Sequence, residues 1–393
     1  MPIIGAQEKK LNPIVTILLS ILVFGFLIFV HEFGHYIFAR IFKVTIYEFS
    51  IGMGPRIITY KSKKTGIKYS LSAIPFGGYV SMAGEDGVYK EDTAPSAEVG
   101  GDAYQALVMN EDGQGDVCDA PAEDPNGFDK KPAWQRFIIT VAGAFVNLVV
   151  GFIVLIIFTS VSDIGGTRVA NVYEIKDEPQ YEYITSDDLI LEGDLITEID
   201  GKSVSISDEL VYEVMRRGNE PVSVTVIRDG KELVIPKVSF PRATESGQSF
   251  GTINFQVCWT EKTFGTVLSY SFQKGILMIR MCWEALFDLI TGRYGFEAVS
   301  GPVGVSSAIG EAASGGISPL LYILALISIN LGVMNMLPIP ALDGGRTLTI
   351  LVEMVTRKRM PPKVEQIING VGLALLLGLS AVILIKDVIQ LII

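Results

Sequence analysis

Four long runs without a single charged residue constrain this chain more than any other feature. They cover residues 11–30, 137–162, 312–342 and 366–385, and each holds at least 20 residues. About 20 apolar residues in a helix cross the roughly 30 Å hydrocarbon core of a bilayer. With 49% hydrophobic residues and a mean hydropathy of +0.41, the sequence predicts a polytopic α-helical membrane protein with four transmembrane helices.

The first apolar run ends in the motif His31-Glu32-Phe33-Gly34-His35, which holds the only two histidines of the chain. Four residues apart on a helix, His31 and His35 project from the same face and can share a Zn²⁺. Glu32 can then act as general base on a water, as in H-E-x-x-H metalloproteases. Two unrelated histidines at a helix end are the alternative. Polar groups at membrane depth are costly without a role, and this favours a metal site.

A catalytic zinc site needs three protein ligands and an open position. Since no third histidine exists, an Asp, Glu or Cys must serve, and Asp343 closes the third apolar run. Pro338 and Pro340 should break the helix there and turn Asp343 inward. A solvated Asp at a helix end is the alternative, but the need for a third ligand favours Asp343.

Two further motifs allow a role in the site. Gly77 and Gly78 lie in an apolar β-element over residues 45–83, whose edge could pair with an extended substrate or belong to an ordinary hairpin. Asn147 lies four residues after Gly143 inside the second run, where it could either join helices or lie beside the metal.

The remaining segments are polar. Residues 85–129 hold thirteen acidic residues and one basic residue, so almost all of the net charge of −11 belongs to an acidic loop that we predict to be disordered. No basic nucleic-acid footprint is present. Short strands and turns over residues 164–242 predict a small β-rich domain, and residues 264–289 an amphipathic helix at the interface.

The basic residues near the ends of the runs predict the orientation. They cluster after the first run, before the second and between the third and fourth, namely at Arg40, Lys43, Lys130, Lys131, Arg136, Arg346, Arg357, Lys358, Arg359 and Lys363. Positive residues favour the cytoplasm, so the motif and Asp343 lie towards that side and the β-rich domain lies outside. Lys9 and Lys10 count against this orientation.

These motifs together resemble the site-2 protease family of intramembrane zinc metalloproteases, in its bacterial RseP-like branch with an extracytoplasmic PDZ domain. The resemblance rests on the order of the motifs, from HEFGH through the Gly-Gly-Tyr element and Gly143-x-x-x-Asn147 to Ser300-Gly301-Pro302 and the stretch from Asn335 to Gly344. Two departures are Ala142-Gly143-Ala144, where relatives often have proline, and residues 185–190, which lack the usual small-residue run of bacterial PDZ domains.

The resemblance implies that His31, His35 and Asp343 bind zinc and that Glu32 is the catalytic base. It also implies that Asn335, Pro338 and Pro340 hold the substrate backbone, with Asn147 near the site. It implies a multi-pass protein of the bacterial cell membrane that cuts transmembrane segments of single-span proteins, such as anti-sigma factors or remnant signal peptides. The lipid bilayer is the other expected partner.

The predicted organisation follows the motifs in order. We expect the first transmembrane helix with the motif over residues 1–44, the β-element over 45–83, the acidic loop over 84–132 and the second transmembrane helix over 133–162. The PDZ-like domain should follow over 163–243, and the amphipathic helix with a Gly/Ser-rich connector over 244–317. The third transmembrane helix with Leu-Asp-Gly-Gly should cover 318–345, and a basic loop with the fourth helix 346–393.

The competing function is a non-proteolytic membrane scaffold with a structural metal site and a PDZ-like partner-binding domain. A structural zinc site is closed by four ligands, whereas this sequence offers three candidates and a ready base. A metal transporter would need acids or histidines along a path through several helices, and the runs other than the first are nearly free of them.

Overall fold

The computed structural model describes residues 11–85, 124–172, 181–182, 190–217, 220–245, 248–293 and 299–392. The acidic loop between residues 86 and 123, with Cys118, lies outside the described residues, as does most of the segment 185–190. The chain divides into two compact units, residues 1–151 with 282–393 and residues 152–281. Helices α2 (Ala133–Val161) and α4 (Phe264–Thr291) each contribute residues to both units.

The four predicted apolar helices are confirmed as helices long and apolar enough to cross a membrane. They are α1 (Pro13–Ile41), α2, α6 (Ile317–Asn335) and α8 (Pro362–Ile392). The shorter helices of the first unit are η2 (Phe128–Lys130), α5 (Pro302–Ser314) and α7 (Asp343–Thr356). Insertion of the four long helices in a bilayer remains a prediction.

The structure differs from the predicted organisation around Asp343. The third apolar run is helical only as far as Asn335, and Asp343, which we expected within the third-helix segment 318–345, begins a new helix, α7. This helix continues into the stretch after residue 345, where we expected a basic loop. The break falls before Pro338 and Pro340, because proline cannot continue the hydrogen-bond ladder of a helix. A short amphipathic helix forms after the break because the side chains of residues 347 and 350 are buried on one face.

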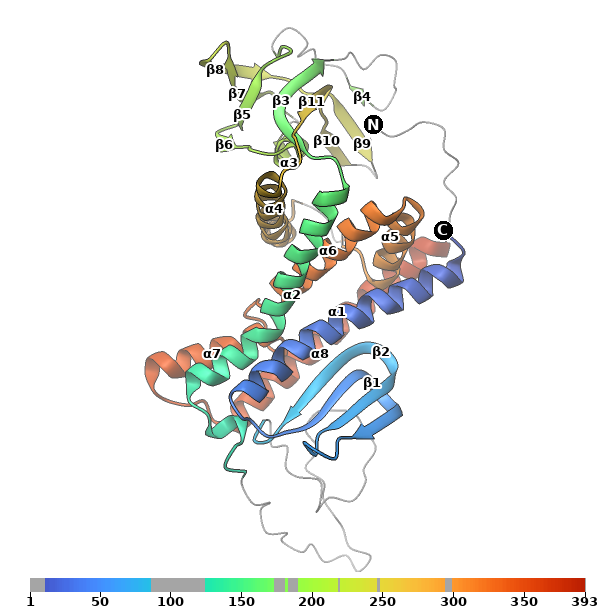
Figure 1. Ribbon diagram of the computed structural model, residues 1–393, viewed down its shortest axis with the longest axis vertical. Helices are drawn as coiled ribbons and strands as arrows, with labels where there is room; N and C mark the ends of the chain where they lie inside the picture. Colours follow the sequence, from blue (N-terminus) through green and yellow to red (C-terminus); the bar gives the residue numbers. More distant parts are fainter. Residues whose placement is uncertain are drawn as a thin grey trace, which may run out of the picture. The chain divides into compact units, whose positions relative to one another are not determined.

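The β-element consists of two long strands, β1 (Ile46–Lys61) and β2 (Lys68–Met82), which lie beside α1 (Figure 1). The first half of β1 pairs on both sides, since Ser50 is opposite both Tyr79 and Ser70. The chain can fold back in this way because Gly52, Gly54 and Gly77 take positive φ angles. In the registers of the described strands, residues 78–82 pair on one side only, with residues 46–51.

The second unit is β-rich, as predicted. Its strands are β3 (Gly165–Val172), β4 (Tyr181–Glu182), β5 (Leu195–Ile199), β6 (Lys202–Ser203), β7 (Val222–Arg228), β8 (Lys231–Val238), β9 (Arg242–Glu245), β10 (Gln248–Gly251) and β11 (Phe255–Trp259). A six-stranded sheet has the order β11-β3-β5-β7-β8 with β6 on β5, and a three-stranded sheet has the order β10-β9-β4.

The core of this unit is aliphatic. Alternate residues of β7, Val222, Val224 and Val226, are almost fully buried, and they pack with Leu210 and Val214 of helix α3 (Ser207–Arg217). The unit extends beyond the predicted boundary at residue 243, because β11 pairs with β3 far away in the sequence. Its likeness to a PDZ domain remains a prediction.

Candidate metal centre

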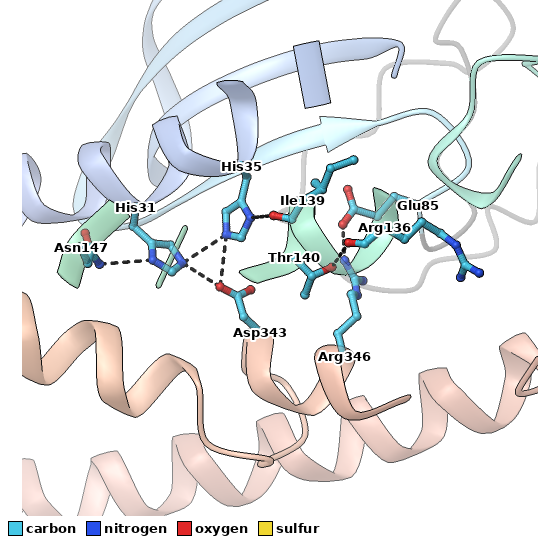
Figure 2. Close-up of polar contacts among 9 residues, drawn as sticks. All are labelled: His31, His35, Glu85, Arg136, Ile139, Thr140, Asn147, Asp343 and Arg346. Carbon is cyan, nitrogen blue, oxygen red and sulfur yellow. Dashed lines mark hydrogen bonds and ion pairs between the residues drawn. The ribbon is translucent and has the colours of Figure 1, made fainter. Parts of the chain in front are cut away.

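Three side chains bring their ligand atoms together beside the end of α1 (Figure 2). The Oδ2 atom of Asp343 lies 3.1 Å from His31 Nε2 and 3.2 Å from His35 Nε2, and the two Nε2 atoms are 3.3 Å apart. All three side chains are at least three-quarters buried. The structure therefore unites the two predicted histidine ligands with the predicted third ligand, which is 308 residues after His35 in the chain.

The donor set fits a zinc ion. Two imidazole nitrogens and one carboxylate oxygen are the ligand combination of catalytic zinc sites, which keep a fourth position open. The Oδ2 atom of Asp343 is also fully buried, and no hydrogen bond of acceptable geometry satisfies it among the described residues. A buried carboxylate oxygen without a donor is costly, and a cation between the three side chains removes that cost.

The remaining nitrogen of each imidazole has a partner on α2. His35 Nδ1 donates to the carbonyl oxygen of Ile139 over 2.8 Å. This hydrogen bond fixes the tautomer in which Nε2 carries a free lone pair for a metal. Ile139 was not predicted, because a backbone carbonyl acceptor leaves no mark in the sequence.

Asn147 lies beside the other imidazole, 3.3 Å from its amide nitrogen to His31 Nδ1. The amide oxygen of Asn147 is buried and has no partner in this orientation. Rotating the amide by 180° exchanges its oxygen and nitrogen, so that the oxygen accepts the Nδ1 proton of His31. The rotated amide satisfies its oxygen and leaves Nε2 of His31 free for a metal. The Asn147 side chain thus lies beside His31, and its role in the site stays a prediction.

Glycines allow α1 and α2 to approach closely enough for these contacts. A Cβ atom on Gly34 would lie 2.9 Å from the carbonyl carbon of Ala142. A Cβ atom on Gly143 would overlap the imidazoles of both His31 and His35. Position 143 must therefore be glycine for the two imidazoles to occupy these positions.

The third side chain is placed by the loop over residues 336–342. Gly344 and Gly345 lie against the backbone of this loop, where any side chain would collide with the carbonyls of Leu337 and Ile339. The loop is also held from α8, where the Asn369 side chain accepts the backbone N–H of Ala341 over 3.4 Å. These contacts explain why two glycines follow Asp343 directly.

The Asp343 carboxyl lies in the first turn of α7, outside the four apolar helices. Burial raises its pKa, but the attraction and hydrogen bonds of His35 and His31 in their charged form outweigh burial, so the net pKa falls below its ordinary value. The N-terminus of a helix also favours a negative charge. Asp343 is therefore held as a carboxylate, the form that binds a cation.

Glu32 lies between the histidines in the sequence and faces the β-element. A Cβ atom on Gly78 would lie 2.8 Å from Glu32 Cγ and 2.9 Å from the carbonyl oxygen of Ser50. The Glu32 carboxylate is within electrostatic reach of both imidazoles and Asp343. Glu32, the predicted base, therefore contacts Gly78, the first residue of the segment 78–82 that pairs on one side only.

The other predicted residues precede Asp343 along the chain. Asn335 is the last residue of α6, and Pro338 and Pro340 lie in the loop that follows it. Pro340 packs against α8 at Gly372, where a Cβ atom would lie 2.9 Å from the Pro340 carbonyl carbon. The structure thus places these three residues in the segment that carries the third ligand.

Two ion pairs that the sequence analysis missed hold α7 from one side. Arg136 of α2 donates to Glu353 over 2.5 Å. Arg346 donates to Glu85, three residues after the end of β2 (Figure 2). The Arg136 side chain is nearly buried and also donates to the carbonyl oxygen of Lys131. The helix that begins with Asp343 is therefore anchored to two other elements.

Comparison with known proteins agrees with this geometry. The model of peptidase family M50 matches residues 19–379. The chain belongs to peptidase family M50. This assignment confirms the resemblance to site-2 proteases and the expected enzyme class, a metalloprotease.

Relatives of known name cover almost the whole chain. A candidate zinc metalloprotease of Fusobacterium nucleatum is 31% identical over 387 residues, which are 95% of this chain and 98% of the relative. Zinc metalloprotease RasP of Shouchella clausii is 28% identical over 96% of this chain and 99% of the relative. Regulator of sigma-W protease RasP of Bacillus subtilis is 27% identical and covers 95% and 98%. The similarity therefore includes both units of the M50 chain.

Proposed function

We propose that this M50 peptidase is an intramembrane zinc metalloprotease that cleaves transmembrane segments of single-span membrane proteins. The observation that carries the proposal is the convergence of His31, His35 and Asp343, whose ligand atoms all lie within 4.8 Å of one another. His31 and His35 would bind zinc through Nε2 and Asp343 through its carboxylate. The names of the relatives support zinc as the metal.

Bound zinc would supply Lewis-acid polarisation of the scissile carbonyl and would make water acidic enough to lose a proton near neutral pH. Glu32 accepts the proton of the attacking water and then delivers it to the leaving amine. Ile139 and Asn147 keep the two imidazoles in one tautomer through the cycle. The close packing at Gly143 and Gly34 holds α2 against the two imidazoles, so that Ile139 and Asn147 can reach them.

Residues 78–82 of β2, which pair with β1 on one side only, suggest how a substrate would be held. A transmembrane helix must unwind locally before its peptide bond can reach the site, and an unwound strand has unsatisfied backbone groups. Residues 78–82 can add such a strand by backbone hydrogen bonds, next to Glu32. Gly77 and Gly78 would bind the substrate strand close to Glu32, and Asn335, Pro338 and Pro340 would hold the substrate backbone from the loop before Asp343.

The substrate class follows from the family and one relative. The Bacillus subtilis relative is named as the regulator of sigma-W protease, so anti-sigma factors are suitable first substrates to test, with remnant signal peptides as the second class. The positive residues support an orientation in which the metal site would lie towards the cytoplasm of a bacterial cell membrane and the β-rich unit outside. That unit would then act as a PDZ-like filter on incoming substrates.

The test uses the purified full chain in detergent, with zinc content and cleavage of a single-span peptide as two separate readouts. We expect one zinc per chain and cleavage for the wild type. Glu32→Gln should keep zinc and lose cleavage, and Asp343→Ala should lose both. Glu232→Gln, at an exposed position on β8, is the matched control and should change neither. Zinc binding without cleavage in the wild type would instead support the scaffold with a structural metal site, and full cleavage by Glu32→Gln would refute Glu32 as the base.

A further inference from the structure

Helix α7 has an apolar face that stays substantially exposed in the described part of the chain. Its outward-facing residues are Leu348, Leu351, Val352 and Val355, which are 46%, 41%, 46% and 84% exposed. Their spacing of i, i+3, i+4 and i+7 places them along one stripe of the helix. Together they form what we call the α7 stripe.

The opposite face of α7 is fully used by the protein. Thr347 and Ile350 are buried, and Ile350 belongs to a core cluster with residues of α1, β1 and β2. Arg346 and Glu353 form the ion pairs with Glu85 and Arg136. The helix therefore cannot roll to bury its stripe without breaking these contacts.

The connections keep α7 near a membrane surface. Seven residues separate it from α6 and five separate it from α8, and both neighbours are apolar enough to span. With 14 residues, α7 itself is about 21 Å long, which is too short to cross a core of roughly 30 Å. A short amphipathic helix between two spanning helices is suited to lie in the interface plane.

The charge beside the stripe selects the lipid. Arg357, Lys358, Arg359 and Lys363 follow α7 directly and are all exposed, with Glu365 as the single acid of this stretch. A cluster of four basic residues next to an amphipathic helix attracts anionic headgroups. A second copy of the chain would meet the same positive cluster and be repelled by it.

We propose that the α7 stripe docks on the bilayer surface and that the basic cluster behind it binds anionic lipid headgroups. The docked helix begins with Asp343, so the surface that meets the lipid and the third proposed zinc ligand belong to one rigid element. Lipid contact would thereby fix the depth of Asp343. This inference goes beyond proteolysis, since it concerns a lipid-binding surface.

The test measures probe depth and not cleavage, so it can fail independently of the proposed function. Cys118, Cys258 and Cys282 are replaced by serine, and Val355→Cys is labelled with an environment-sensitive fluorophore. The full chain is placed in vesicles of phosphatidylcholine, with or without a minority of phosphatidylglycerol. Val234→Cys, at an exposed apolar position on β8, serves as the control label.

We expect phosphatidylglycerol to shift the emission at position 355 to shorter wavelength and to increase quenching by headgroup spin labels. The charge reversal Lys358→Glu/Lys363→Glu should abolish this shift, and the milder pair Lys358→Gln/Lys363→Gln should reduce it. Lys231→Glu/Lys237→Glu, which changes the net charge equally on β8, should leave it intact. All three double variants should retain bound zinc and should still cleave the single-span peptide in detergent.

Three outcomes would overturn the inference. A water-like spectrum at position 355 in both vesicles would show that the stripe stays in solvent. Equal shifts with and without phosphatidylglycerol would refute the role of the basic cluster. A shift in detergent that grows with protein concentration would show that a second copy covers the stripe.

Discussion

At the scale of single residues, the site depends on the groups that form hydrogen bonds with the proposed metal ligands. The imidazole of His31 has one partner on α2, the Asn147 amide at 3.3 Å. We expect Asn147→Leu to weaken zinc binding by about 10–100-fold, because outer partners of metal-bound histidines contribute on this scale. Asn147→Asp keeps an acceptor for Nδ1–H and should lose much less. Zinc affinity measured against a competing chelator checks this, and equal losses in both variants would contradict the hydrogen-bond role.

A second residue-scale prediction concerns the close contact of α1 and α2. Gly143→Ala places a methyl group where the imidazoles of His31 and His35 lie. We expect loss of bound zinc with the helices retained, since only the local packing is violated. Gly25→Ala is the matched control, because a Cβ atom there meets nothing within 4 Å. Zinc content and circular dichroism are the measurements, and normal zinc content in Gly143→Ala would refute the packing argument.

At the scale of elements, α7 is tied to α2 by one nearly buried ion pair. Glu353→Met leaves the charged side chain of Arg136, a residue that is 5% exposed, without its carboxylate. We expect this single change to cost about 3 kcal/mol, whereas Arg136→Met/Glu353→Met should cost less than about 1 kcal/mol. Thermal unfolding in detergent of both single variants and the double variant gives the coupling. Additive effects in this cycle would show that the pair does not anchor α7.

Much of the architecture could be predicted because its signals are local. The apolar runs, the HEFGH motif and the proline break before Asp343 each occupy one stretch of sequence, and the structure places the three expected ligands together. Helix α7 was missed because its apolar stripe is only eight residues long. The pairing of β11 with β3 and the Ile139 acceptor were missed because they depend on contacts between segments about 85 and 104 residues apart.

At the scale of the whole molecule, the β-rich unit carries its own acid sensitivity. Asp194, 1% exposed, accepts two hydrogen bonds from Arg228 at 2.8 Å and one from the backbone of Leu191 at 2.9 Å. Burial raises the pKa of Asp194, but these donors outweigh it, so the net pKa is lower than in the unfolded chain. The stabilisation is therefore complete above the unfolded value of about 3.9 and is lost as the pH falls through the folded value.

We expect hydrogen exchange in β5 and β7, corrected for intrinsic rates, to accelerate below about pH 4 in the wild type. In Asp194→Asn, the free energy of local opening should be lower by about 1.5–3 kcal/mol already at neutral pH, so hydrogen exchange should be faster. The exchange rate of this variant should also change less as the pH falls. Asp229→Asn, at the exposed neighbouring turn, should behave as wild type. An unchanged acid response in Asp194→Asn would assign this sensitivity to other carboxylates, while the metal centre in the other unit would be unaffected by either outcome.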